Sequence, residues 1–305
     1  MPVNFTRIFL IFFLIYFFCS VVISTVLFGS AGQRFIWFGL TLGANCLILP
    51  ANDPYKLIEV LAKFEPLSVR WLCGPYTFSG LNPLVKTEDL KSLHTISCTG
   101  SSFIPAAVEE FLGKMPNRDA ITFQSFFGMT EAVPIIKPQM NNLDPRILGY
   151  PVPNTELKVV GADGKNLGPG RSGELYIRGP QVMKCYYNNE QATREAFDGD
   201  WFKSGDIVYY DETGMFHLIG RSKEEIKVNG ITISPLDWET VLTNHQKVRD
   251  AGVIGVSDNI TVEKAIAFVV PKLGMEIDTE ELNDLSHLNL RRQNFEPNYS
   301  SRGTA

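Results

Sequence analysis

One acid and one base at the two ends of a hairpin-like stretch are the first residues whose chemistry needs explaining. The stretch SGDIVYYDETGMFHLIGR, Ser204 to Arg221, places Asp206 before one β-rich run and Arg221 after a second. The intervening DETG predicts a hairpin connection with glycine where a positive φ is required. Neither charge is needed for that turn. We therefore predict that Asp206 and Arg221 bind a ligand, with two solvated loop charges as the alternative.

Two stretches rich in glycine and hydroxyl groups follow other β-rich runs. In GMTE, Gly128 to Glu131, glycine lets backbone approach a ligand, Thr130 offers a hydroxyl to a phosphate oxygen, and Glu131 offers a carboxylate to Mg²⁺. TGSS, residues 99–102, ends the preceding strand on the same expected edge of a parallel sheet, where ligands bind. With Asp206 able to accept hydrogen bonds from both ribose hydroxyls, these groups predict a nucleotide site in preference to a sugar or peptide site.

Composition narrows the function classes further. The chain has 305 residues, 45% of them hydrophobic and 20% charged, which is enough for a large core and two domains. A net charge of −5 without a basic cluster argues against a nucleic-acid partner. The five cysteines form no C-x-x-C pair and the four histidines match no metal-ligand spacing. We expect free thiols in a reducing compartment and no hydrolase nucleophile set.

The N-terminus is unusually apolar. Ile8 to Phe28 contains 21 residues without a charge, and a helix of that length would cross a bilayer at about 31 Å. We therefore predict a membrane anchor at residues 8–28, whose orientation the symmetric flanking arginines leave open. The alternatives are a buried strand and helix of a soluble core, or a chain start that is not the natural one. Without an anchor we expect a cytoplasmic or peroxisomal protein.

The elements that must position these groups alternate along the first part of the chain. Short apolar runs alternate with amphipathic segments, and this rhythm predicts a βαβ sheet. The sequence places Asp53 as an N-cap, with Pro54 in the first turn of its helix. The expected elements are strands at 46–50, 69–74, 94–102 and 120–131, and helices at 53–66 and 104–116.

The pattern changes after Gly149 to β-hairpins with glycine-rich turns, and then to a compact last module. That module is expected to contain a helix at 234–245, capped by Ser234, followed by strands at 251–257 and 265–271. The fold class predicted from these patterns is α/β, with a βαβ sheet and β-barrel-like hairpins followed by a small α/β domain.

Several long motifs resemble a known family. FFGMTEAVP, GELYIRGPQVMKCYYNNEQATREAF, DWFKSGDIVYYDETGMFHLIGRSKEEIKVNGITISPLDWE and AGVIGVSD together resemble the adenylate-forming superfamily, in particular acyl-CoA synthetases close to 4-coumarate CoA ligase and firefly luciferase. The resemblance covers roughly residues 35–272. It implies an apolar N-terminal segment at 1–34, a remnant of a large ATP-binding domain at 35–221, a small mobile domain at 222–272 and a divergent tail at 273–305.

The resemblance also implies roles for single residues. Residues 99–102 would line the adenine pocket, Phe127 would pack on the adenine ring, Thr130 would touch the α-phosphate and Glu131 would hold Mg²⁺. The implied nucleotide-binding set is Ser101, Ser102, Phe127, Gly128, Thr130, Asp206 and Arg221, and the implied catalytic set is Thr130, Glu131 and Lys227. Phe126 and Gly128 would line the acid pocket, Lys223 would be the hinge, and Gly230 would share the CoA-side loop with Lys227. A solvated loop lysine is the alternative for Lys227.

The activity implied is that of an ATP-dependent carboxylic acid CoA ligase, with ATP, CoA and a small-molecule acid as substrates and Mg²⁺ as cofactor. The sequence departs from the family in lacking a Ser/Thr/Gly-rich phosphate loop ending in Pro-Lys, and in lacking a lysine in a Gly-Lys turn near its C-terminus. We therefore expect this chain to carry an incomplete ligase. The alternatives are a non-catalytic nucleotide-binding fragment or pseudoenzyme, and a membrane-anchored structural protein built on the remnant fold.

Overall fold

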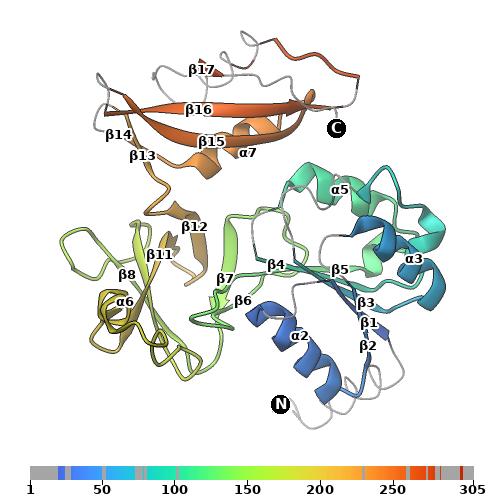
Figure 1. Cartoon of the computed structure of the whole chain (residues 1–305), viewed down its shortest axis with the longest axis horizontal. Coiled ribbons are helices and arrows are strands. Elements are labelled where there is room, and N and C mark those ends of the chain that lie inside the picture. The colour runs from blue at the N-terminus through green and yellow to red at the C-terminus, as the bar shows by residue number, and fades with distance from the viewer. Residues whose placement is uncertain are drawn as a thin grey trace. The chain divides into compact units, whose positions relative to one another are not determined.

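The computed structural model of the chain divides into two units (Figure 1). One unit comprises Met1–Thr155 with Gly179–Lys184, and the other comprises Glu156–Arg178 with Cys185–Ala305. The structure describes residues 20–24, 29–49, 53–72, 78, 81–100, 103–228, 231–258, 262–272, 274–278, 282 and 296–297.

The first unit is built on a parallel sheet in the order β2-β1-β3-β4-β5. Its strands are β1 (Ser20–Ser24), β2 (Asn45–Ile48), β3 (Ser68–Leu72), β4 (Thr95–Thr99) and β5 (Thr122–Phe126). The main helices are α2 (Ser30–Thr41), α3 (Pro54–Phe64) and α5 (Pro105–Gly113), with short 3₁₀ turns at Thr87–Leu90 and Arg118–Ala120. The antiparallel pair β6 (Ile136–Lys137) and β7 (Ile147–Pro151) follows the sheet. This order confirms the predicted βαβ rhythm.

Helices cover both faces of this sheet, because successive strand residues point to opposite sides. On one face, Val22 and Phe123 pack in a large core with residues of α3 and α5. On the other face, Val21 and Ile23 pack against Phe35 and other apolar residues of α2 and the turn after it. Figure 1 shows α2 apart from α3 and α5, as these two cores require.

The apolar segment 8–28 contributes a strand to the sheet. Its residues 20–24 form β1, which lies between β2 and β3, and both Val22 and Ile23 are fully buried. The prediction of one membrane-spanning helix is therefore wrong for these residues, and the alternative of a buried strand is confirmed for them. A strand covered on both faces is a continuous apolar run, which periodicity alone does not separate from a helix. The remainder of the segment, 8–19 and 25–28, lies outside the described residues. Among the helices that the structure describes, none has the length and apolar character to span a bilayer.

Two helices were predicted to begin with a capping side chain, Asp53 for one and Ser234 for the other. Asp53 accepts a hydrogen bond from the backbone N–H of Lys56 at 2.9 Å, and Pro54 is the first residue of α3, as predicted. Ser234 does precede α7 (Pro235–Thr243), but its side chain makes no capping hydrogen bond. Its hydroxyl donates instead to the carbonyl of Ile219 at 2.7 Å. The side-chain role predicted for Ser234 is therefore wrong, since a carbonyl of a neighbouring strand takes the hydroxyl.

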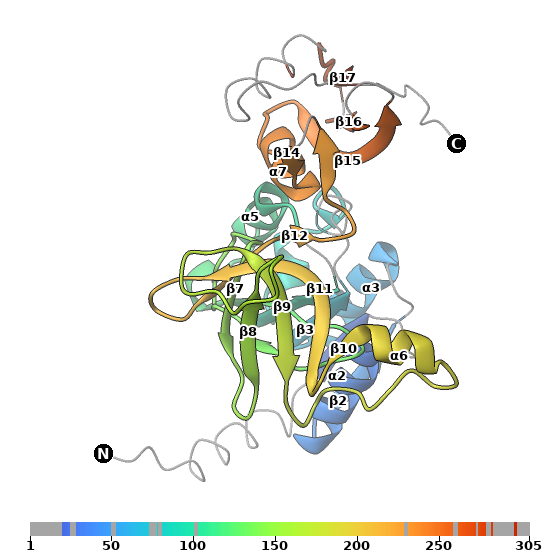
Figure 2. The same ribbon diagram turned by 90° about the vertical axis from the view of Figure 1, so that its left-hand side faces the viewer.

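The second unit contains two mainly antiparallel sheets. The first has the order β12-β11-β9-β8 and curves as Figure 2 shows. Its strands are β8 (Glu156–Val160), β9 (Gly173–Arg178), β11 (Trp201–Tyr210) and β12 (Phe216–Arg221), with β10 (Phe197–Asp198) paired to β11 after the short helix α6 (Glu190–Ala196). The predicted hairpins after Gly149 correspond to these strands.

The last module confirms the predicted helix and two strands. Its sheet has the order β14-β13-β16-β15, with β17 (Glu296–Pro297) parallel to β16. The strands are β13 (Ile226–Val228), β14 (Ile231–Ile233), β15 (Val248–Asp258) and β16 (Val262–Pro271). Trp238 and Leu242 of α7 pack in one buried core with Ile226, Val253 and Ala267. The α/β fold class is confirmed.

A buried acid in this module gives the first testable prediction. Asp250 is 2% exposed, and its Oδ2 atom has no hydrogen-bond partner among the described residues. Burial raises the pKa of Asp250 to about 6, Glu239 raises it further, and the backbone N–H of Ala251 and Arg249 oppose the shift. Because the pKa of Asp250 is higher in the folded than in the unfolded state, its carboxyl group stabilises the folded state most at pH values below the unfolded-state pKa. This stabilisation is lost as the pH rises through 6.

Replacement of Asp250 by asparagine is expected to stabilise the folded chain at pH 8 by on the order of 1–2 kcal/mol, since no buried charge then forms. At pH 4 the two proteins should unfold at similar denaturant concentrations. Urea titrations at both pH values measure the difference. Equal stabilities at pH 8 would show that the carboxylate is not penalised by its surroundings. Exposed Asp163, replaced by asparagine, is the matched control.

Candidate functional site

The hairpin from Ser204 to Arg221 places its acid and base side by side. Strands β11 and β12 are joined through Asp211, whose Oδ1 atom accepts from the backbone N–H groups of Thr213 and Met215 at 2.8 and 3.1 Å. Gly214 has a φ of 83°, as the turn prediction required. The strand register pairs Asp206 directly with Arg221. The two charges at the ends of this stretch therefore lie side by side at the open end of the hairpin.

Asp206 is a buried carboxylate with one oxygen unused. Its side chain is 3% exposed and lies 3.0 Å from Arg221, measured from Oδ1 to Nε, whereas the Arg221 side chain is 57% exposed. The buried Oδ2 atom has no partner among the described residues. Burial raises the pKa of Asp206 to about 6, and Arg221 opposes that rise. Asp206 is therefore not a solvated loop charge, which was the alternative interpretation. The open oxygen suits a hydroxyl donor from a ligand.

The glycine loop after β5 holds Thr130 and Glu131 in a tight turn. The backbone N–H of Met129 donates to the carbonyl of Ala132 at 3.2 Å, and that of Ala132 donates back to Met129 at 3.1 Å. Thr130 is exposed, and its Oγ1 atom lies 3.3 Å from the Oγ atom of Ser30 at the start of α2. No local signal in the sequence joins α2 to this loop, so Ser30 was not predicted as its neighbour.

The two glycine- and hydroxyl-rich stretches lie at one sheet edge, as predicted. Thr99 ends β4 and Phe126 ends β5, and these two residues are opposite each other in the parallel register. The hydroxyl of Thr99 donates to the carbonyl of Phe126 at 3.3 Å. At Gly128, an added Cβ atom would lie 3.1 Å from the Cγ2 atom of Val133, so the loop leaves little room for a side chain. Ser101 and Ser102 lie outside the described residues.

Phe126 belongs to an aromatic and cationic group that the sequence analysis missed. Its ring lies edge-on to Phe35 of α2, with 6.3 Å between the ring centroids. The guanidinium of Arg34 lies 5.3 Å from the centroid of Phe126 and 5.1 Å from that of Phe35. Arg70 of β3 contributes a second guanidinium, 5.7 Å from Phe35. The available signal was an arginine inside the apolar run of β3, where a charge is rare unless it has a partner.

The residues expected on the CoA side follow the hairpin. Lys223 is exposed in the turn after β12, which fits a connecting position. Lys227 lies on β13, where its backbone N–H donates to Oε2 of Glu263 at 2.6 Å and its side chain is exposed. Gly230 lies outside the described residues.

Glu131 is the expected Mg²⁺ ligand. In the part of the chain that the structure describes, no three His, Cys, Asp or Glu side chains cluster in a way that could hold a metal ion. Mg²⁺ commonly keeps several waters and takes only one or two protein carboxylates together with substrate phosphates. A single half-buried carboxylate beside Thr130 fits that mode of binding and does not fit an all-protein metal site.

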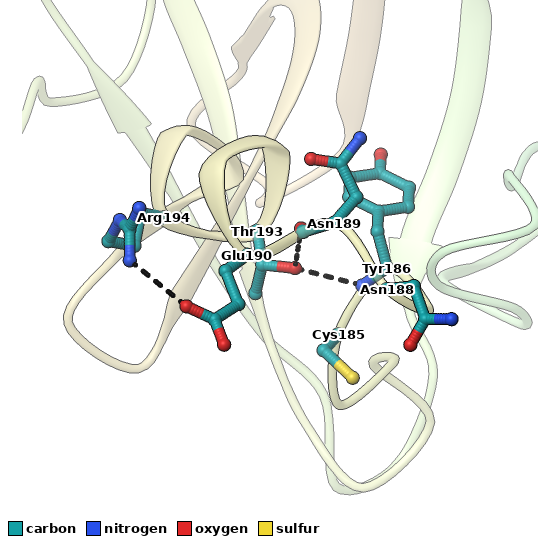
Figure 3. Close-up of a pocket in the computed structure, with 7 residues that line it drawn as sticks. All are labelled: Cys185, Tyr186, Asn188, Asn189, Glu190, Thr193 and Arg194. Carbon is teal, nitrogen blue, oxygen red and sulfur yellow. Dashed lines mark hydrogen bonds and ion pairs between the residues drawn. The ribbon is translucent and has the colours of Figure 1, made fainter.

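A separate hollow lies at the start of α6 (Figure 3). Asn189 caps this helix by accepting from the N–H of Ala192 at 3.0 Å. The hydroxyl of Thr193 accepts from the N–H of Tyr186 at 3.0 Å and donates to the carbonyl of Asn189 at 2.8 Å. These contacts order the helix start. No residue of the expected nucleotide site lines the hollow, whose walls are Cys185, Tyr186, Asn188, Asn189, Glu190, Thr193 and Arg194.

Two family models match the chain. A family model described as AMP-binding enzyme matches residues 19–187, and a model of the AMP-binding enzyme C-terminal domain matches residues 237–295. The chain belongs to the AMP-binding enzyme family, which confirms the resemblance inferred from its motifs. The match begins upstream of Phe35, where the resemblance was expected to start, and it therefore includes β1 and the whole of α2.

Named relatives place the chain beside CoA ligases. It is 35% identical over 249 residues to a probable 4-coumarate–CoA ligase 3 of Dictyostelium discoideum, covering 80% of this chain and 45% of that protein. It is 31% identical to a long-chain-fatty-acid–CoA ligase of Bacillus subtilis, covering 81% of this chain and 44% of that protein. The solved structure of an amide bond synthetase from Marinactinospora thermotolerans shares the fold, with a TM-score of 0.79 at 24% identity over 93% of this chain and 59% of that one. The chain thus spans about half the length of the curated relatives it matches.

Proposed function

We propose that this chain is the AMP-binding part of an ATP-dependent carboxylic acid–CoA ligase. In the reaction of the whole protein, a carboxylate attacks the α-phosphorus of ATP, which yields an acyl-adenylate and releases pyrophosphate. The CoA thiolate then attacks the acyl carbon and AMP leaves. Carrying out the reaction in two steps lowers the activation barrier to thioester formation, because a carboxylate is a poor electrophile until its oxygen becomes part of a good leaving group. The names of the relatives and the open carboxylate at Asp206 support the proposal.

Different residues are proposed for the sugar and for the phosphate of the nucleotide. Asp206 accepts the ribose hydroxyls through its open oxygen, and Arg221, already paired with Asp206, donates to the same sugar. Thr130 donates to the α-phosphate, where charge builds up during adenylate formation. Phe127, Gly128, Ser101 and Ser102 complete the nucleotide contacts.

Glu131 is the proposed Mg²⁺ ligand, and its role rests on carboxylate chemistry. Bound there, Mg²⁺ would neutralise charge on the phosphate oxygens. Glu131 supplies one hard oxygen from the loop that also carries Thr130, so both would act on the same end of the nucleotide. The loop is held by its own Met129 and Ala132 backbone hydrogen bonds, which order the backbone that carries both side chains before a ligand arrives.

The second half-reaction is assigned to the small domain. We propose a large domain that ends at Arg221, a small domain at 222–272 and a tail at 273–305. Because β1 lies in the parallel sheet and α2 packs on it, the large domain begins within the segment 1–34 and not at residue 35. Lys223 is the proposed hinge. Lys227 and Gly230 would act on the side where CoA attacks, since the exposed Lys227 side chain is available to a ligand.

The observation that carries the proposal is the buried Asp206 carboxylate, which is paired through one oxygen and open at the other. Isothermal titration calorimetry of the 305-residue chain with AMP tests it. We expect one AMP per chain, displaced by a non-hydrolysable acyl-adenylate analogue. A folded sample that binds neither AMP nor the analogue would contradict the proposal.

Phe126 is expected to limit the length of the acid. Its ring occupies volume at the proposed acid pocket and is fixed edge-on against Phe35. Replacing Phe126 by glycine should therefore raise the affinity for a dodecanoyl-adenylate analogue by on the order of tenfold relative to a butyryl analogue. Calorimetric titration of both analogues measures this ratio. Phe64, an exposed ring on α3, replaced by glycine at the helix end, is the control. Preference for the long analogue in the unaltered chain would contradict the prediction.

A further inference from the structure

Two arginines and two phenylalanines form a cluster on the face of the parallel sheet that α2 covers. This arginine cluster consists of Arg34 and Phe35 of α2, Arg70 of β3, and Phe126 of β5. Arg34 lies 5.1 Å from the ring centroid of Phe35 and 5.3 Å from that of Phe126, and Arg70 lies 5.7 Å from Phe35. All four residues belong to the first unit.

Within the cluster, Arg34 carries a positive charge that no described ion pair offsets. Arg70 is 6% exposed and donates to the hydroxyl of Ser97. Arg34 is half-buried, forms no ion pair among the described residues, and has a buried Nε–H group without a hydrogen-bond partner there. Burial and the neighbouring charge of Arg70 both lower the pKa of Arg34. Aromatic faces offset only part of the cost of burying a cation, and an unused guanidinium donor favours a bound anion.

The cluster lies beside the loop assigned to the α-phosphate. Phe126 directly precedes the loop that carries Thr130. Ser30 and Arg34 are four residues apart on α2 and therefore share one face of that helix. Since Ser30 approaches Thr130 to 3.3 Å, Arg34 is displaced from this contact by one helical turn, or about 6 Å along the axis. An acyl chain bound next to Thr130 would reach Arg34 with its far end.

We infer that the acid pocket takes a dicarboxylic acid, whose second carboxylate pairs with Arg34 while the first is adenylated beside Thr130. This inference rests on the proposed function and names the substrate class of the same site. A carboxylate accepts two parallel hydrogen bonds from a guanidinium, including one from the open Nε–H. Arg70 adds charge from the sheet side, and the rings of Phe35 and Phe126 exclude water from the pair.

Two acyl-adenylate mimics of equal chain length test the inference. Hexanoyl-sulfamoyl-adenosine and adipoyl-sulfamoyl-adenosine differ only in a terminal methyl group against a terminal carboxylate, and neither needs turnover to bind. Calorimetry on the full chain at low salt should show about tenfold or more tighter binding of the adipoyl compound. The ratio should fall as salt is raised. Succinyl and suberoyl mimics report the distance between the two anion positions.

Variants assign the preference to the cluster. Arg34→Met keeps a long unbranched side chain but removes the guanidinium, and it should bring the two affinities to within about twofold. Arg34→Lys keeps the charge without the planar donors, so it should retain a smaller preference that is more sensitive to salt. Arg118→Met removes an exposed arginine of the same unit, which is paired with Glu109, and should leave the ratio unchanged. If Arg34→Met does not fold, the comparison in the unaltered chain and in Arg34→Lys decides.

Equal affinity for the two mimics, or preference for the hexanoyl compound, with AMP binding intact would overturn the inference and leave the proposed function standing. Absence of AMP and mimic binding in a folded sample would overturn the proposed function itself. A preference for the adipoyl compound that survives Arg34→Met would place the second anion site elsewhere and overturn the assignment to this cluster.

Discussion

Asparagine in place of Asp206 is expected to raise the dissociation constant for AMP by about 10- to 100-fold. The carboxylate offers a buried, charged acceptor through its open Oδ2 atom, and a hydrogen bond to a charged group contributes about 1.5–3 kcal/mol. Asparagine keeps the shape but loses the charge, and it leaves Arg221 without its ion-pair partner. Calorimetric titration with AMP measures the change.

The control for this prediction is Asp198→Asn, which removes an exposed carboxylate from the same unit and should leave the affinity within about twofold. Circular dichroism and a urea titration show whether each variant is folded. An AMP affinity for Asp206→Asn equal to that of the unaltered chain would remove Asp206 from the nucleotide site and, with it, the main support for the proposed function.

The affinity for adenosine is expected to depend on pH through the ionisation of Asp206. Because burial raises the pKa of Asp206 to about 6, the carboxylate is ionised at pH 8 and largely protonated at pH 5. Affinity for adenosine, which has no titrating phosphate, should therefore fall roughly tenfold between these pH values in the unaltered chain. In Asp206→Asn the slope should vanish. The stability contribution runs the opposite way, since a raised pKa in the folded state favours folding at low pH and loses that effect above pH 6.

The hairpin could be predicted from local chemistry, but the pairing of its charges could not. Counting back from the turn, Tyr210 pairs with Phe216 and Val208 with Leu218, so a regular register would place Asp206 opposite Gly220. The register shifts between Ile207 and Val208, and this irregularity brings Arg221 opposite the acid. The carbonyl of Ile219, in the strand segment facing the shift, accepts the hydroxyl of Ser234. Ser234 lies 15 residues after Ile219 and outside the hairpin stretch. The shifted register that forms the site therefore coincides with a contact that the hairpin sequence alone does not contain.

The sheet edge was predictable because the rule that governs it is topological. Parallel neighbouring strands end at the same edge, so the order of β4 and β5 along the chain sufficed to bring Thr99 to Phe126. Nothing in local sequence joins Arg34 to Phe126, however, since they meet only when α2 packs on the sheet. Residues 20–24 were misassigned for a related reason. These residues are buried because β2, β3 and α2 pack around them, and the apolar run by itself does not show which elements will cover it.

We expect this polypeptide to retain the second half-reaction, thioester formation, and to lose most of the first, adenylate formation. Adenylate formation from ATP requires donors for the β- and γ-phosphates and for the departing pyrophosphate, and the sequence has no Ser/Thr/Gly-rich run ending in Pro-Lys to supply them. Each missing donor typically costs on the order of 10² to 10³ in rate. Thioester formation from a preformed acyl-adenylate involves only the AMP half of the nucleotide, for which Asp206, Arg221 and Thr130 are present.

We therefore expect the chain to convert synthetic acyl-adenylate and CoA into thioester at least about 100-fold faster than it converts acid, ATP and CoA into the same product. Chromatographic detection of the thioester, with and without enzyme, measures both rates. Lys227→Ala should slow the reaction of the preformed adenylate, whereas Lys165→Ala, which removes another exposed lysine of the same unit, should not. Equal rates from the two starting points would show that the polypeptide holds the β- and γ-phosphates by other groups. An unchanged rate in Lys227→Ala would leave that side chain a solvated lysine of β13, because its backbone contact with Glu263 does not depend on the ammonium group.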